Sequence, residues 1–160
     1  MTSLTRSLPA LLLLGCAGGG GASDTTDDHS GLTGTAPVSC TARVDGESWE
    51  AAPELAFWNS YHPDSLSVSC ALADSSSGIV INLAGYTGPG TYALDGASWA
   101  QLNGGVMSTD PGAWLSTTGA VEVTRDSGGV VAGTFAFDGS DATAATTKIV
   151  TDGAFVLEHE

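Results

Sequence analysis

The sequence predicts an all-β domain, a single antiparallel β-sandwich or up-and-down β-barrel of about nine strands. Apolar and polar residues alternate in several short runs, and this period of two is typical of a strand with one buried face. Turn residues separate the runs at regular intervals, with no helical segment between them. The 22 glycines and the low content of charged residues, 14%, also favour strands and turns over helices. The pattern fits a sandwich and a barrel equally well.

Residues 1–15 are expected to be an export signal. The cation Arg6 precedes a short apolar run at residues 8–14. This run is far shorter than the roughly 20 apolar residues that a membrane-spanning helix needs. We therefore expect the segment to be removed during export.

The signal ends in Leu13-Leu14-Gly15-Cys16, which resembles the lipobox of bacterial lipoproteins. This resemblance implies that the peptide is cut before Cys16 and that the Cys16 thiol carries a diacylglycerol, so that the partner of the anchor is a membrane. Because Ala17 is not acidic, the resemblance also implies delivery to the outer membrane of the bacterial cell envelope. The alternative is an ordinary signal peptide that is cut elsewhere.

Residues 16–37 are expected to be the lipidated cysteine and a flexible tether. Glycine, serine, threonine and aspartate dominate this segment, which has no hydrophobic periodicity and therefore builds no core. A flexible linker of this length has a root-mean-square end-to-end distance of roughly 25 Å. Asp27, Asp28 and His29 lie together in the tether, but we interpret them as part of a solvated spacer rather than as metal ligands.

The folded domain is expected to span residues 38–160. Its first strand, at 38–44, has an apolar residue at every second position, and Asp45-Gly46 ends it in a turn. Pro53 breaks the segment that follows, so the next strand is expected at 55–58. Strands with clear alternation or with flanking turn residues then follow at 66–72, 79–83, 91–94, 99–102 and 113–117.

Residues 119–138 are expected to form the hairpin around which the domain is organised. Val121 and Val123 alternate with polar residues in the first arm, and Phe135 and Phe137 do so in the return arm. A glycine-rich turn joins the two arms. A slip of one residue would turn both phenylalanine rings to water, so the register is strongly specified.

The C-terminal part is expected to begin with a loop at 138–147, because its composition is typical of loops. Two short strands, at 148–151 and 154–158, are expected to follow as a pair around an Asp152-Gly153 turn. His159 is next to the C-terminus and is expected to be frayed.

Cys40 and Cys70 are expected to form a disulfide. They are the two cysteines that remain in an exported, oxidising setting once Cys16 carries the anchor. Each lies on the apolar face of its predicted strand, so both thiols are expected to point into the core.

The charge balance excludes one class of partner. Four Lys and Arg residues against 18 Asp and Glu residues give a formal net charge of -14. Nucleic-acid binding needs a basic surface that so few cations cannot make. The acidic residues keep an exported protein soluble; the alternative is that aspartates coordinate calcium, although no spacing matches a defined calcium loop. No metal and no cofactor are expected.

Several short motifs of the domain resemble those of uncharacterised lipoprotein β-domains of bacterial envelopes. These motifs combine turn glycines with core aromatic residues, and the resemblance brings no catalytic residue with it. They are Val44-Asp45-Gly46 with Trp49, Gly90-Thr91-Tyr92, Gly133-Thr134-Phe135 and Gly153-Ala154-Phe155.

The sequence contains no recognisable catalytic motif of the common hydrolase, nucleotide-binding or thiol-redox types. A catalytic triad would have to use His62 or His159, and we interpret His62 as part of a structural turn. Paired carboxylates can hydrolyse glycosides, but most candidate aspartates precede glycine, where a turn explains them.

The expected function is therefore that of an envelope lipoprotein with a non-catalytic binding or structural β-domain. The alternative is a hydrolase that acts on envelope polysaccharide or peptide. Binding is expected at the segments 59–64 and 98–111, which combine aromatic and polar side chains, although ordinary turns would also explain them. The candidate ligand-binding residues are Tyr61, His62, Trp99, Gln101 and Asn103.

Overall fold

The computed structural model describes residues 37–104 and 112–160. The expected signal peptide at 1–15, the lipidation site Cys16 and the tether as far as residue 36 lie outside the described residues. In the described part of the chain, no helix has the length and apolar character that crossing a membrane requires.

The predicted all-β class is confirmed. The described residues form ten strands in one sheet, together with a single-turn 3-10 helix, η1 (Pro53–Leu55). The strands are β1 (Ser39–Val44), β2 (Glu47–Glu50), β3 (Ala56–Asn59), β4 (Ser65–Ala71), β5 (Gly78–Ala84), β6 (Gly90–Ala93), β7 (Trp99–Asn103), β8 (Ala113–Ser127), β9 (Val130–Ser140) and β10 (Thr147–Glu158).

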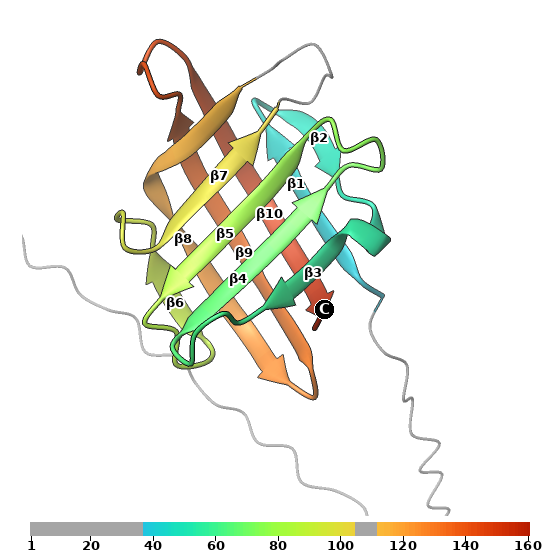
Figure 1. Cartoon of the computed structure of the whole chain (residues 1–160). Coiled ribbons are helices and arrows are strands. Elements are labelled where there is room, and N and C mark those ends of the chain that lie inside the picture. Colours follow the sequence, from blue (N-terminus) through green and yellow to red (C-terminus); the bar gives the residue numbers. More distant parts are fainter. Residues whose placement is uncertain (1–36, 105–111) are drawn as a thin grey trace, which may run out of the picture. The chain divides into compact units, whose positions relative to one another are not determined.

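The sheet is antiparallel and curls into a half-barrel around its core. Its strand order is β2-β1-β10-β9-β8-β7-β5-β4-β3, and β6 pairs separately with β8. Figure 1 shows the strands from β7 to β3 in front of β8, β9, β10 and β1, and running across them. The apolar sides of both groups face one another, so the predicted alternation places one side chain of every two in the core.

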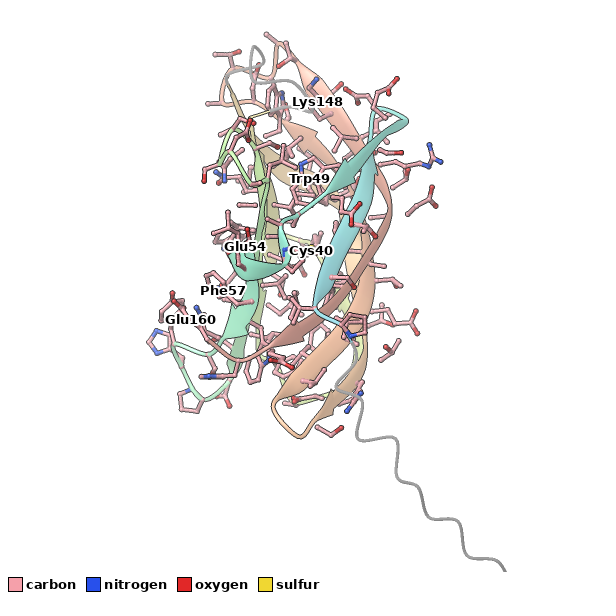
Figure 2. The ribbon with its side chains drawn as sticks, turned by 90° about the vertical axis from the view of Figure 1, so that its right-hand side faces the viewer. Cys40, Trp49, Glu54, Phe57, Lys148 and Glu160 are labelled. Atoms are coloured by element: carbon pink, nitrogen blue, oxygen red, sulfur yellow. A yellow bond between two sulfur atoms is a disulfide. The ribbon has the colours of Figure 1, made fainter. Side chains whose placement is uncertain are left out.

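The expected disulfide is confirmed and ties β1 to β4. Cys40 and Cys70 lie 30 residues apart in the chain, and their Cα atoms are 6.2 Å apart. Both side chains are fully buried, with exposed fractions of 0% and 1%. Cys40 points into the interior between the two parts of the sheet, whereas Phe57 on β3 points away from it (Figure 2).

Glycines in the long strands make room for the phenylalanine rings of the core. Gly133 lies opposite Phe155, and Gly153 lies opposite Phe135, across the β9–β10 pair. Gly119 lies opposite Phe137 across the β8–β9 pair. A Cβ atom at Gly153 would sit 2.5 Å from the ring of Phe135, so a larger residue there would displace the ring. These close approaches explain why glycine stands inside strands, where it is otherwise unfavourable.

The prediction of two C-terminal strands around Asp152-Gly153 is wrong, because β10 is one continuous strand. Asp152 adopts a φ of 51°, and the register shifts between Val150 and Gly153, which is a β-bulge rather than a chain reversal. The neighbouring β1 and β9 both pair with β10 on each side of the bulge, so the strand direction is maintained. The strand expected at 113–117 likewise continues into the first hairpin arm to form β8.

The expected fraying at His159 is also wrong. Its ring packs edge-on against Trp58, with 4.6 Å between the ring centroids. The His159 backbone N–H donates to the Gly129 carbonyl at 3.1 Å, and the Glu160 N–H donates to the Trp58 carbonyl at 3.1 Å. The end of the chain is therefore fastened to the edge strand β3.

Candidate functional site

Three of the predicted binding residues lie side by side on β7. Trp99, Gln101 and Asn103 alternate with the buried Ala100 and Leu102, so all three project from the outer side of the sheet. The strand expected at 99–102 is confirmed as β7, so these residues belong to a strand and not to a loop of the segment 98–111. Residues 105–111 of this segment lie outside the described residues.

A depression beside Trp99 forms where β7 and β8 separate. The two strands pair only from Gln101–Leu115 to Asn103–Ala113, and further along β8 turns to pair with β6. At the point of separation the Ser116 hydroxyl accepts a hydrogen bond from the Ala100 N–H at 3.0 Å, which replaces a backbone partner. The depression has a volume of ≈ 200 Å³ and is lined by Gly96, Trp99, Gln101, Leu115 and Ser116.

Leu115 lines both this depression and a second one. The second has a volume of ≈ 450 Å³ and extends from Gln101 towards the loop that begins at Asp141. The side chain of Leu115 is 49% exposed, which is high for a large apolar residue. Gln101 contributes to both depressions, and its amide nitrogen donates to the side-chain oxygen of Asn103.

Trp99 differs from the other tryptophans in its hydrogen bonding. Trp49 donates its indole N–H to the Ser77 hydroxyl at 3.1 Å, and Trp58 donates to the Gly129 carbonyl at 3.0 Å. Trp114 donates to the Thr146 hydroxyl at 2.9 Å. Within residues 37–104 and 112–160, the Trp99 N–H has no hydrogen-bond partner. Three tryptophans are thus fixed by the fold, whereas Trp99 presents a half-buried ring with an open donor.

Sheet pairing extends the surface around Trp99 to the opposite edge of the sheet. Trp99 pairs with Asn82 on β5, Asn82 with Ser67 on β4, and Ser67 with Asn59 on β3. A second row next to it contains Gln101, Val80, Ser69 and Phe57. We call the outward side chains of β3, β4, β5 and β7 the uncharged face, because none of the residues in these four fully described strands carries a charge.

Tyr61 lies at the far margin of the uncharged face. Its hydroxyl accepts a hydrogen bond from the Asn59 side-chain amide at 3.1 Å, and the residue is 74% exposed. The side-chain oxygen of Asn59 is buried and has no partner within the described residues. Asn59 and Trp99 are separated by three strand spacings, or roughly 14 Å. Tyr61 and Trp99, one from each predicted binding segment, therefore lie at opposite sides of the uncharged face.

His62 belongs to the turn that joins β3 to β4, and its backbone organises that turn. The His62 N–H donates to the Ser65 hydroxyl at 3.1 Å, and its carbonyl accepts from the Ser60 hydroxyl at 2.6 Å. The residue is exposed. Among the described residues, no three His, Cys, Asp or Glu side chains are grouped closely enough to hold a metal ion. Within the described part of the chain, the contacts of His62 are therefore those of a structural turn.

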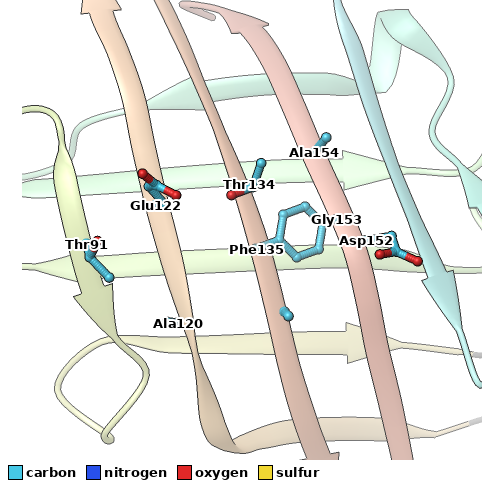
Figure 3. Close-up of a pocket in the computed structure, with 9 residues that line it drawn as sticks. Thr91, Ala120, Glu122, Thr134, Phe135, Asp152, Gly153 and Ala154 are labelled. Carbon is cyan, nitrogen blue, oxygen red and sulfur yellow. The ribbon is translucent and has the colours of Figure 1, made fainter. Parts of the chain in front are cut away.

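The opposite outer side of the sheet carries a larger but different hollow. It has a volume of ≈ 520 Å³ and spreads over β6, β8, β9 and β10. Figure 3 shows Glu122 and Asp152 on either side of Thr134 and Phe135. The Phe135 ring forms part of the floor of this hollow, because Gly153 has no side chain to cover the ring. This hollow results from small residues on a charged surface, and its polar lining consists of Thr91, Glu122, Thr134 and Asp152.

The loop between β9 and β10 is organised by the carboxylate of Asp141. It accepts hydrogen bonds from the Thr146 and Thr143 hydroxyls and from backbone N–H groups at residues 143, 145 and 146. These bonds, that of the Thr146 hydroxyl foremost, hold the pKa of Asp141 well below its usual range. Asp141, which lines the second depression at this loop, is therefore an ionised carboxylate with both oxygens hydrogen-bonded.

Comparison with known proteins found no matching family model, no matching curated protein and no matching solved structure. The chemistry of the uncharged face is therefore the basis on which a function can be argued.

Proposed function

We propose that this chain is a lipid-anchored envelope protein whose β-domain binds a ligand on the uncharged face and does not catalyse a reaction. The observation that carries the proposal is Trp99, whose indole N–H has no partner among the described residues and which lies beside a depression lined by an amide and a hydroxyl. Binding sites combine an apolar wall with a few polar groups in this way. The hydrolase alternative has no comparable support, because His62 lies in a structural turn.

We also propose that the half-barrel closes into a flattened barrel with a filled interior. The hydrogen bond from the Glu160 N–H to the Trp58 carbonyl supports closure, because it joins the edge strand β3 to the end of β10. The bond from the Ala52 N–H to the Ala71 carbonyl supports it at the other end of the barrel. With the interior filled by side chains, the outer surface is where a ligand would bind.

The anchor of the proposed protein is Cys16, supported by the resemblance of Leu13-Leu14-Gly15-Cys16 to a lipobox and by the Gly-, Ser- and Asp-rich composition of the segment that follows. Cys16→Ser is expected to move the full-length protein from the membrane to the soluble fraction, because serine cannot carry the thioether-linked lipid. Each buried methylene contributes about 0.8 kcal/mol and one chain binds only marginally, so a multiply acylated cysteine is needed for firm anchoring. Membrane fractionation measures this, with Ser23→Ala in the tether as the control. Detection of unmodified Cys16 in the mature protein by mass spectrometry would contradict the anchor.

Trp99→Ala is expected to weaken binding to an envelope component about tenfold or more, which corresponds to about 1.4 kcal/mol for each factor of ten. The purified domain would be titrated against peptidoglycan, lipid vesicles and the envelope polysaccharide fraction. Because Trp99 is only half-buried, the thermal midpoint of the Trp99→Ala variant is expected to stay within a few degrees of that of the wild type. The control is Ile149→Ala, which removes a 52% exposed residue from β10 on the charged side of the sheet.

Two results would contradict this functional proposal. Equal binding by the wild type and Trp99→Ala would remove the uncharged face from the site. Turnover of an envelope polysaccharide or peptide that disappears with His62→Ala would replace the binding function by the hydrolase.

A further inference from the structure

The charges of the domain are distributed unevenly between its two outer sides. β3, β4, β5 and β7 contain no charged residue, although the chain has a net charge of -14. The outer side formed by β8, β9, β10 and β1 carries the exposed Glu122, Asp138, Asp152 and Arg43. A ligand can therefore cover the uncharged face without removing any charged group from water, which would be costly.

The polar groups that remain on the uncharged face are amides and hydroxyls. The row that starts at Trp99 continues with Asn82, Ser67 and Asn59, and Gln101 stands beside it. The side chains of Asn82, Ser67, Asn59 and Gln101 can each both donate and accept hydrogen bonds. Ser67 is only 9% exposed although it points outward, so the side chains of this face pack closely against one another. Groups of this kind match a ligand that presents many hydroxyls at short intervals.

Trp99 supplies the apolar component of the same surface. Its half-buried ring stands at the side of the depression opened by the separation of β7 from β8. The negative face of an indole ring attracts the positively polarised C–H groups on the apolar face of a sugar ring. Its N–H, which has no partner within residues 37–104 and 112–160, can donate to a hydroxyl of the same ligand.

We propose that the uncharged face binds a neutral glycan, which lies across β7, β5, β4 and β3 with one sugar ring against Trp99. The inference rests on the proposed binding function and adds the class of ligand. The acidic domain repels polyanions, which disfavours acidic polysaccharides. A protein partner is disfavoured because Phe57, Val80 and Trp99 are the only large apolar side chains in the two rows, whereas the centre of a protein interface is more strongly apolar.

The test is a titration of the purified domain with neutral oligosaccharides of glucose, mannose, galactose and N-acetylglucosamine, and with oligogalacturonate as the acidic comparator. We expect saturable binding of at least one neutral oligosaccharide, no binding of oligogalacturonate, and an affinity that does not change with ionic strength. Trp99→Ala is expected to weaken that binding about tenfold or more. Gln101→Ala and Asn82→Ser are each expected to weaken it by roughly two- to tenfold, which is the range for one lost hydrogen bond.

Thr134→Ala is the matched control, because Thr134 is an outward polar residue of β9 on the charged side. The affinity of the Thr134→Ala variant for the oligosaccharide is expected to equal that of the wild type. Circular dichroism and the thermal midpoint establish that each variant is folded, and Gln101→Ala keeps the test valid if a change at Asn82 disturbs the sheet.

Binding of oligogalacturonate, or of none of the oligosaccharides, would overturn the glycan inference. If envelope binding still depends on Trp99 in that case, the proposed binding function survives; the ligand is an acidic polysaccharide where oligogalacturonate binds, and a lipid, a peptide or a protein where no oligosaccharide does. If Trp99→Ala binds the envelope fraction as the wild type does, the proposed function itself fails. Self-association that Trp99→Ala abolishes, without any glycan binding, would assign the face to a second copy of the chain and would also overturn the inference.

Discussion

Replacing both Cys40 and Cys70 by alanine is expected to lower the free energy of unfolding by roughly 3 to 4 kcal/mol. The disulfide joins residues that are 30 positions apart, so it removes much of the conformational freedom of the unfolded chain. The thermal midpoint is expected to fall by about 10 °C or more for a domain of this size. Urea denaturation followed by circular dichroism measures the loss.

Reduction of the wild-type domain provides the control for this change. The reduced wild type and the double variant are expected to have nearly equal stabilities, since both lack the cross-link and keep the same strands. Two titratable thiols in the unfolded, unreduced wild type would contradict the disulfide. A double variant within about 1 kcal/mol of the oxidised wild type would mean that the cross-link contributes little.

Gly133→Ala is expected to destabilise the domain by about 3 kcal/mol or more, which is the upper part of the range for overpacking a core. A Cβ atom at Gly133 would sit 2.3 Å from the Glu122 carbonyl oxygen and 2.7 Å from the Phe155 ring. The first contact is with the backbone of β8, so no change of rotamer can relieve it. Chemical denaturation of the variant measures the loss.

The matched control is Gly128→Ala in the turn between β8 and β9. Gly128 has a φ of 64°, and nothing lies within 4 Å of a Cβ atom there. Its replacement by alanine is therefore expected to lower the free energy of unfolding by only about 1 to 2 kcal/mol, which is the cost of the left-handed conformation for a residue with a Cβ atom. Gly133→Ala with Phe155→Leu relieves one of the two close contacts and tests whether the ring contributes to the strain. Equal losses at Gly133 and Gly128 would contradict the packing argument.

The strands and the core faces could be predicted from local pattern. The alternation around Leu66, Val68 and Cys70 places all three in the core, with exposed fractions of 0%, 1% and 1%. The pairing of Cys40 with Cys70 could be predicted from a count, because the expected anchor at Cys16 would leave these two cysteines to pair. Both inferences depend on information within a few residues or on a count of one residue type.

Two of the four Asp-Gly pairs, Asp45-Gly46 and Asp152-Gly153, show why the topology could not be predicted in full. The aspartates have nearly the same φ, 52° and 51°, but one pair reverses the chain and the other produces a bulge. Gly46 also has a positive φ, of 86°, which completes a hairpin turn between β1 and β2. At Asp152 the chain is held straight by β1 and β9 on its two sides, and these neighbours are distant in sequence.

The candidate site was predictable in its residue types and unpredictable in its extent. Trp99, Gln101 and Asn103 were recognised as a mixture of aromatic and amide side chains within a few positions. Asn82 and Ser116 were missed, because they join the site only through the pairing of β7 with β5 and the separation of β7 from β8. The polar position of Asn82 in an otherwise apolar strand was the available signal, but sequence alone does not identify its neighbours.

The pairing of β1 with β10 has a consequence for the speed of folding. The Ile149 N–H donates to the Asp45 side chain across 104 residues, so the first strand of the domain cannot complete its pairing until the last strand is present. Contacts so distant along the chain slow folding, and β-proteins of this kind take milliseconds to seconds. The cross-link from Cys40 to Cys70 reaches only as far as β4, and it can therefore hold β1 against the early strands while β10 is still unplaced. In an oxidising compartment, thiol oxidation would thus shorten the time during which β1 presents an unpaired edge to other chains.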